Sequence, residues 1–383
     1  MDTLQPTLRN GRLIWDRINM PTDEFQSRID VLKSKMEEEN IDLVLAYGHA
    51  FDHSDNVSYL SNYVIRLPRG ALVGIPRNGE PVLFFEGAPR GLPSAKTITW
   101  IEDVRPCKDV ARACAAYIKE KALMPSTMGL VALHQWMPHH QLAFLLDALK
   151  DCRIVKADPI MNAMRAVKSP KECDQIRRAS RAVSRVFRTI TETSLPGLNE
   201  RTLEATLYRA ARLEGAEDVR LLLGRPQDGD WAFRPAEDLP LKTEETVILY
   251  LALVFERYWS EGIRTFLTTG NGLKIPSDMT SLESAYSQLL NAMEPRKALS
   301  ECYTKALGRI NEMDGYSIPG LSFAQGIGLS LKERPAFDAS AAGNLDPGMA
   351  FSLHLALKDE TLGTVMMGHT HLVSEHEIET LTL

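Results

Sequence analysis

The chain has 383 residues, more than one ordinary domain requires, so two domains are expected. Hydrophobic residues make up 44% and charged residues 25%, and the net charge of −6 disfavours nucleic acid and anionic membranes as partners. Five cysteines without CxxC spacing are typical of reduced thiols, and the longest apolar run, Val247–Phe255, is too short to cross a bilayer, so a cytoplasmic protein is predicted.

The first part of the chain alternates helical and strand patterns. Apolar residues at helical spacing predict a helix over Asp23–Asn40. Runs typical of strands are Ile41–Tyr47, Gly70–Pro76, Pro81–Gly87 and Met128–His134. Two further helices are predicted over Val104–Leu123 and Pro138–Leu149. This alternation predicts a layered α/β domain over residues 1–158.

The second part, residues 159–383, begins with a strong helix start. Ser169-Pro170-Lys171-Glu172 combines a Ser N-cap, Pro at the first helical position and Glu at the third. The helix is predicted to continue to Thr193, and a second helix is predicted over Asn199–Glu214. Strand patterns then dominate, interrupted by two helical stretches, Met279–Met293 and Lys297–Met313. The sequence therefore predicts an α+β second domain, with helices packed against a curved sheet.

Several motifs resemble one known family in sequence and order. They are Asn56–Tyr63 (NVSYLSNY), Met164–Ala179, Ser260–Phe266 (SEGIRTF), Phe323–Leu329 (FAQGIGL) and Leu345–His354 (LDPGMAFSLH). The chain resembles the creatinase/prolidase/methionine-aminopeptidase family, and the resemblance covers nearly its whole length. It implies a creatinase-like N-terminal domain followed by a pita-bread domain with a curved antiparallel sheet.

This sequence differs from the family at the positions of the metal ligands. Metallo-members hold two divalent ions with two Asp, one His and two Glu. Their positions fall, in order, on Tyr250, Glu261, Gln325, His354 and Gly368. Only Glu261 keeps a carboxylate, and two cations need several anionic oxygens. The resemblance thus predicts a divergent member with no metal and no other cofactor.

Glu261 and His354 are the main catalytic candidates. Non-metal relatives such as creatinase use Glu residues in this pocket, and burial is expected to raise the pKa of Glu261 toward the range useful for proton transfer. Two simpler interpretations stay open. Glu261 can form a salt bridge with Arg264, which is otherwise a substrate-binding candidate, and His354 can be a satisfied core residue on an apolar strand.

Further candidates surround these two. His369 and His371 lie on one face of a strand, and His369 is expected to reach inward beside Gly368. His369 and Glu333 are predicted to assist catalysis, and Gln325, His371 and Tyr250 to bind substrate. Lys332 either binds substrate or belongs to a charged surface turn. A zinc ion on the histidines is a minor alternative.

Two other regions are predicted to contact the substrate. Ala232 stands where the resemblance places a His, between Trp231 and Phe233, which can stack on a ligand or fill the old cavity. In creatinase-like dimers an Arg of the N-terminal domain caps the partner's pocket, and Arg66 and Arg69 occupy the matching stretch. His49, His53 and Asp55 are weaker candidates nearby.

Three functional hypotheses follow. The first is a metal-independent, creatinase-like hydrolase that cleaves a non-peptide C–N bond in a small carboxylated or zwitterionic substrate. The second is an inactive pita-bread protein that serves as a binding or assembly partner. The third is an Xaa-Pro peptidase-like enzyme with a rebuilt metal site. The resemblance implies a homodimer, or a heterodimer with a paralogue.

Overall fold

The computed structural model describes residues 14–50, 54–65, 69–195, 197–226, 232–317 and 324–382. The chain divides into two compact units on either side of the Arg165–Ala166 bond. Helix α7 (Asp158–Ala166) ends the first unit, and the predicted boundary between 158 and 159 falls in its first turn. Within the described ranges, every helix is too short or too polar to span a membrane.

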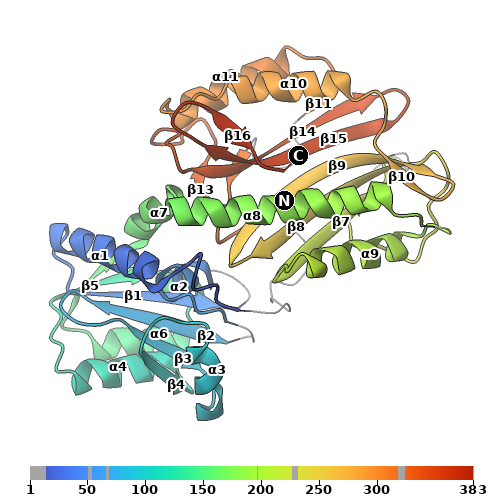
Figure 1. Ribbon diagram of the computed structural model, residues 1–383. Helices are drawn as coiled ribbons and strands as arrows, with labels where there is room; N and C mark the ends of the chain where they lie inside the picture. The colour runs from blue at the N-terminus through green and yellow to red at the C-terminus, as the bar shows by residue number, and fades with distance from the viewer. Residues whose placement is uncertain are drawn as a thin grey trace. The chain divides into compact units, whose positions relative to one another are not determined.

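A mixed sheet with strand order β4-β3-β2-β1-β5-β6 forms the centre of the first unit. Its strands are β1 (Leu43–His49), β2 (Gly70–Pro76), β3 (Val82–Glu86), β4 (Asp103–Cys107), β5 (Thr127–Val131) and β6 (Arg153–Lys156). Its other helices are α1 (Thr22–Glu38), α2 (Ser54–Ser61), the short turn η1 (Pro89–Gly91), α3 (Leu92–Lys96), α4 (Val110–Glu120), α5 (Leu133–Trp136) and α6 (His139–Ala148). Helices α1 and α2 lie on one side of the sheet, and α4 and α6 on the other (Figure 1). The predicted α/β layering is confirmed.

The helix predicted over Val104–Leu123 is wrong in its first part. Residues Asp103–Cys107 form the edge strand β4, which pairs with β3 in parallel, and α4 begins only at Val110. Pro106 lacks the N–H that a helix interior requires, but an edge strand tolerates it. Asp109 then caps α4, because its carboxylate accepts a hydrogen bond from the N–H of Arg112 at 3.0 Å.

An antiparallel sheet with the order β13-β12-β14-β15-β9-β8-β7 forms the second unit. Its strands are β7 (Asp218–Gly224), β8 (Thr246–Phe255), β9 (Tyr258–Thr269), β10 (Gly272–Lys274), β11 (Tyr316–Ser317), β12 (Ala324–Gly326), β13 (Glu333–Ala336), β14 (Ala350–Asp359), β15 (Gly363–Val373) and β16 (Ile378–Thr380). Its helices are α8 (Pro170–Glu192), α9 (Glu200–Leu213), α10 (Thr280–Asn291) and α11 (Leu299–Asn311). The capping box at Ser169 and Glu172 is present, as predicted.

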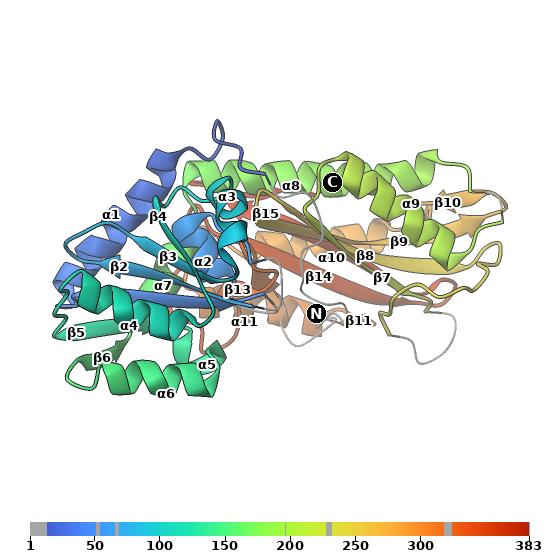
Figure 2. The ribbon, with the colours of Figure 1, turned by 90° about the horizontal axis from the view of Figure 1, so that it is seen from below.

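All four helices of the second unit cover the same face of its sheet. Leu249, Arg264, Met367 and Leu355 are successive cross-strand partners on β8, β9, β15 and β14, so they share this face. Leu249 belongs to the core formed with α8 and α9, and Leu355 to the core formed with α10 and α11. Figure 2 shows α8 and α9 along β8 and β9, with α10 beside β14. We call this side the helix-covered face.

Candidate active site

Strand pairing places the main catalytic candidates together on the other side of the sheet. Tyr250 pairs with Ile263, Ile263 with Gly368, and Gly368 with His354. Cross-strand partners project from the same face, and so do residues two apart on one strand, which adds Glu261. We call this side the opposite face. It carries four of the five positions that hold metal ligands in the family's metallo-members, and Gln325 joins them through its pairing with Ser352.

Glu261 lies at the centre of a buried hydrogen-bonded group. The hydroxyl of Tyr250 donates to Oε2 of Glu261 at 2.5 Å, and Nε2 of His354 lies 3.1 Å from Oε1. This approach does not meet hydrogen-bond geometry, and neither Oε1 nor this Nε2 has a hydrogen-bond partner in the described chain. Tyr250 and Glu261 are 1% exposed and His354 is 5% exposed. We call these three residues the triad.

The triad fixes the charge of Glu261. Burial alone would raise the pKa of this carboxyl, but His354, then Ser352 and Tyr250, stabilise the anion and lower the pKa to about 2. The expectation of a raised pKa is therefore wrong, because the neighbouring donors outweigh desolvation. Burial and the charge of Glu261 raise the pKa of Tyr250 well above its usual value. At neutral pH Glu261 is thus an anion and Tyr250 a neutral donor.

Gly368 makes room for the ring of His354. A Cβ atom at position 368 would lie 2.5 Å from Cδ2 of His354 and 3.1 Å from the side chain of Ile263. Both distances are shorter than ordinary contacts, and the first would be a severe overlap. The imidazole therefore occupies space that a side chain at position 368 would need. His at 354 and Gly at 368 are mutually dependent.

The donors on this face do not fit a pair of divalent cations. Glu261 supplies the one carboxylate among the five ligand positions, and Tyr250 and His354 already contact both of its oxygens. Two hard cations need several oxygen ligands with more negative charge. Over the described ranges, no group of three or more His, Cys, Asp or Glu side chains is arranged to hold a metal ion.

His369 and His371 share a face, as predicted, but it is not the face of Glu261. His369 pairs with Leu353 and His371 with Phe351, so both project from the helix-covered face. Nδ1 of His369 contacts the carbonyl oxygen of Thr382, and Nε2 of His371 lies 2.8 Å from the hydroxyl of Tyr286. The expectation that His369 reaches inward beside Gly368 is wrong, because successive residues of a strand alternate between faces.

Arg264 also lies on the helix-covered face, so the possible salt bridge with Glu261 does not form. Its partners across the sheet are Leu249 and Met367. A spacing of three residues on a strand puts Glu261 and Arg264 on opposite faces. Instead, the Arg264 guanidinium carbon lies 5.4 Å from the centre of the Phe187 ring.

Three other candidates lie on or directly next to strands β12 and β13, at one edge of the sheet. The amide of Gln325 donates to the carbonyl oxygen of Leu331 at 3.1 Å, which leaves its own oxygen for other contacts. Glu333 forms a buried ion pair with Lys168 at 2.8 Å, an arrangement that favours a structural role. Lys332 is exposed, which favours the surface-turn interpretation.

The remaining candidates are only partly described. Trp231, Arg66 and His53 lie outside the described residues. The Phe233 ring packs edge-on against Tyr250, with 6.3 Å between ring centres, so this aromatic residue does lie beside the triad. In the first unit, Arg69 is exposed, His49 is partly buried, and Asp55 forms a 2.6 Å ion pair with Arg165. Substrate binding by Arg66 or Arg69 stays a prediction.

Sequence reasoning missed two hydroxyl residues around Glu261. Ser352 stabilises its carboxylate, and the Thr370 hydroxyl accepts from the Glu261 N–H at 3.0 Å and donates to its carbonyl at 2.9 Å. Ser352 stands two residues before His354, and Thr370 two residues after Gly368. The two-residue period of strands was therefore the signal that could have found both.

Comparisons with known proteins show the family to which the chain belongs. The model of metallopeptidase family M24 matches residues 174–375, more than half of the chain, and that of the creatinase/prolidase N-terminal domain matches residues 28–167. Ectoine hydrolase of Halomonas elongata is 22% identical over 397 residues, which cover 94% of this chain and 95% of that protein.

Other matches are shorter or concern the fold alone. The probable dipeptidase PepE of Mycobacterium bovis is 25% identical over 219 residues, 57% of this chain and only 58% of that protein. The prolidase structure from Pyrococcus horikoshii OT3 has a TM-score of 0.74 at 19% identity and covers 93% of this chain and 98% of that one. The predicted fold, a creatinase-like domain followed by a pita-bread domain, is confirmed.

Proposed function

Because this chain belongs to metallopeptidase family M24, we propose that it is a hydrolase in which the triad replaces the metal ions. One observation carries the proposal. His354 Nε2 lies 3.1 Å from Oε1 of a carboxylate whose pKa is lowered to about 2. A buried carboxylate that holds an imidazole in one orientation is the arrangement that makes a His an effective general base.

The protons move through His354 in this proposal. Glu261 only accepts hydrogen bonds at neutral pH, so Nε2 of His354 carries the ring proton and Nδ1 carries the lone pair. Nδ1 takes a proton from a water molecule whose oxygen attacks the carbon of the C–N bond, and Glu261 stabilises the imidazolium. As the C–N bond breaks, Nδ1 returns the proton to the leaving nitrogen. Glu261 and Tyr250 act as positioning residues.

The proposed substrate is a small carboxylated or zwitterionic molecule with a non-peptide C–N bond. Support comes from ectoine hydrolase, which matches nearly the full length of both chains, whereas the match to the probable dipeptidase covers 57% of this one. The substrate carboxylate needs a cation. In the homodimer that we propose with this function, Arg66 or Arg69 of a second copy supplies it.

Purified protein freed of metal by chelation tests this function. Ectoine and a panel of ureido acids would be incubated with it, and hydrolysis followed by proton NMR. We expect turnover without metal, a loss of at least about 100-fold in His354→Gln and Glu261→Gln, and a smaller loss in Tyr250→Phe. The surface variant His376→Gln serves as the control. Full activity in His354→Gln, or activity that returns only with added metal, would contradict the proposal.

A further inference from the structure

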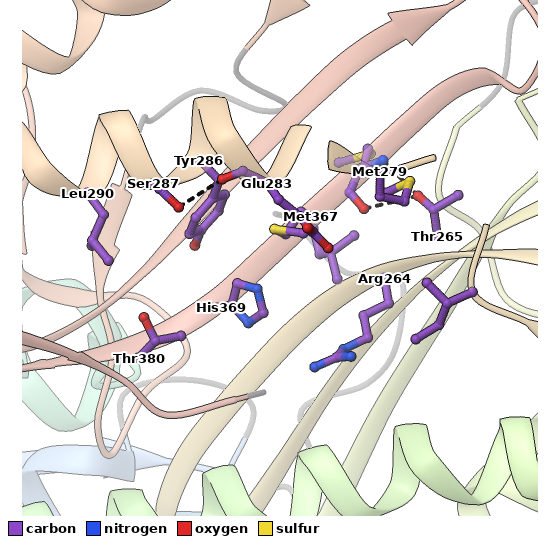
Figure 3. A pocket seen from close by; sticks show the side chains of 13 residues that line it. Arg264, Thr265, Met279, Glu283, Tyr286, Ser287, Leu290, Met367, His369 and Thr380 are labelled. Atoms are coloured by element: carbon purple, nitrogen blue, oxygen red, sulfur yellow. Dashed lines mark hydrogen bonds between the residues drawn. The ribbon is translucent and has the colours of Figure 1, made fainter. Parts of the chain in front are cut away.

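A cavity of about 370 Å³ opens on the helix-covered face (Figure 3). Strands β9 and β15 form its floor and helix α10 one wall, and its apolar side chains include Ile275, Met279, Leu290 and Met367. Small-molecule sites typically measure about 300–1,000 Å³ and have mainly apolar walls. The triad projects from the other side of the sheet and contributes nothing to this cavity. The size and lining are those of a separate ligand site.

Arg264 brings a positive charge into this cavity. Its side chain is partly buried, and burial lowers its pKa, yet an arginine keeps its proton in proteins. No carboxylate among the described residues lies within ion-pair distance of it. Its one aromatic neighbour is the ring of Phe187. A desolvated guanidinium without an anion favours a bound carboxylate, which it can contact through two parallel hydrogen bonds.

His369 adds a hydrogen-bond acceptor. Figure 3 shows its ring between Tyr286 on α10 and Arg264 on β9. Burial and then the charge of Arg264 lower the pKa of His369 to about 4, so the ring is neutral. Nδ1 contacts the carbonyl oxygen of Thr382, which can only accept, so Nδ1 carries the proton and Nε2 the lone pair.

The other polar groups of the cavity are already satisfied. The Tyr286 hydroxyl donates to the carbonyl of Leu353 at 2.9 Å and contacts His371. Glu283 lines the cavity from an exposed position on α10, where water solvates its charge. One guanidinium and one lone pair therefore remain for a ligand, with apolar walls around them.

We propose that this cavity binds a small carboxylate that carries an apolar side chain and a neutral hydrogen-bond donor next to the carboxylate, as an apolar 2-hydroxy acid does. The carboxylate pairs with Arg264, the hydroxyl donates to Nε2 of His369, and the side chain lies against Met279 and Met367. A neutral donor fits better than an ammonium group, because the charge of Arg264 repels a second cation. The site is independent of the proposed hydrolase activity.

Calorimetric titration with three related probes tests the site. They are 2-hydroxy-4-methylpentanoate, 4-methylpentanoate and the methyl ester of the first. We expect saturable binding of the hydroxy acid, about tenfold weaker binding without the hydroxyl, and none of the ester. Binding of the ester as tight as that of the acid, or no saturation by any probe at millimolar concentration, would refute the proposal.

Variants then locate the ligand. Arg264→Gln is expected to weaken the hydroxy acid at least tenfold, whereas Arg178→Gln, which removes a guanidinium 4.7 Å from the Phe255 ring, leaves binding unchanged. Met279→Trp fills the cavity while Arg264 itself is kept, and it should also abolish binding, so the test does not depend on the folding of the Arg264 variant alone. His354→Gln must bind normally. If it does not, the ligand occupies the opposite face and the assignment is wrong.

Discussion

His354 and Gly368 depend on each other through one close contact. The imidazole lies where a side chain at position 368 would stand, and its Nε2 contacts the surviving carboxylate of Glu261. A hydrogen-bonded carboxylate needs no cation, because His354 and Tyr250 stabilise its charge. The Tyr250 hydroxyl donates to one oxygen of the buried anion, and the His354 ring lies close to the other.

Replacing Gly368 by Ala tests this dependence. The added methyl would meet Cδ2 of His354 at 2.5 Å, so we expect a loss of about 1–3 kcal/mol in the free energy of unfolding, measured with urea. The cost should shrink in a His354→Ala background. Gly308→Ala is the control, since nothing lies within 4 Å of its added methyl, and it should be neutral or stabilising. Equal stability of Gly368→Ala and the parent would refute the contact.

The sequence predicted part of the site for a clear reason. Motif positions alone brought Tyr250, Glu261 and His354 to one place, because the family resemblance carries their register. Register also decides which face of the sheet a residue occupies. The expectations that Arg264 pairs with Glu261 and that His369 reaches inward beside Gly368 were wrong because they ignored this. Strand parity would have excluded both from the triad, since each stands an odd number of residues from a position on the opposite face.

At the scale of elements, the start of helix α8 is stabilised by a local capping box and by a hydrogen bond from a residue that is distant in sequence. Glu172 completes the capping box with Ser169, and its Oε1 also accepts a hydrogen bond from Tyr258 of β9 at 2.9 Å. The cap could be predicted because all its parts lie within four residues. The contact to Tyr258 could not, because it spans 86 positions. Strand β4 was missed because its pairing with β3, about 20 residues earlier, is also outside the reach of a local pattern.

Variants of this helix start separate the two roles. Ser169→Ala removes the cap and should cost about 1 kcal/mol of unfolding free energy. Glu172→Ala removes the half of the capping box that Glu172 supplies and also the acceptor of the Tyr258 hydroxyl, so we expect a cost of about 2–3 kcal/mol. Lys171→Ala in the same turn should stay within about 0.5 kcal/mol of the parent. If the Glu172 and Ser169 variants lose equal stability, the contact with Tyr258 contributes nothing.

At the scale of the whole molecule, one sheet of the second unit carries both proposed sites, one on each face. Strand β9 contributes to both, because Glu261 belongs to the triad and Arg264 lines the cavity. Two histidines on the helix-covered face also resist protonation, and one of them, His369, lines the cavity. Burial lowers the pKa of His369 to about 4 and that of His371 well below its usual value.

Stability should therefore fall as the pH drops from about 6.5 toward 4. The unfolded chain binds protons at these histidines near pH 6.5, whereas the folded chain does not until lower pH, so protonation favours unfolding. His369→Gln should lose about 2 kcal/mol less than the parent between pH 7 and pH 5 in urea titrations. Glu261 adds nothing in this window, because its contribution is lost only as pH falls from about 4.5 to 2. His376→Gln should follow the parent curve.

The close contact between positions 354 and 368 also limits which side chains either position can carry. Restoring Glu at 368 alone would drive a carboxylate into the imidazole, with its first carbon already 2.5 Å from Cδ2. Restoring Glu at 354 alone would set two anions side by side in a dry interior. Each of these single substitutions is therefore expected to destabilise the protein, because each damages the contacts of the residue that stays unchanged.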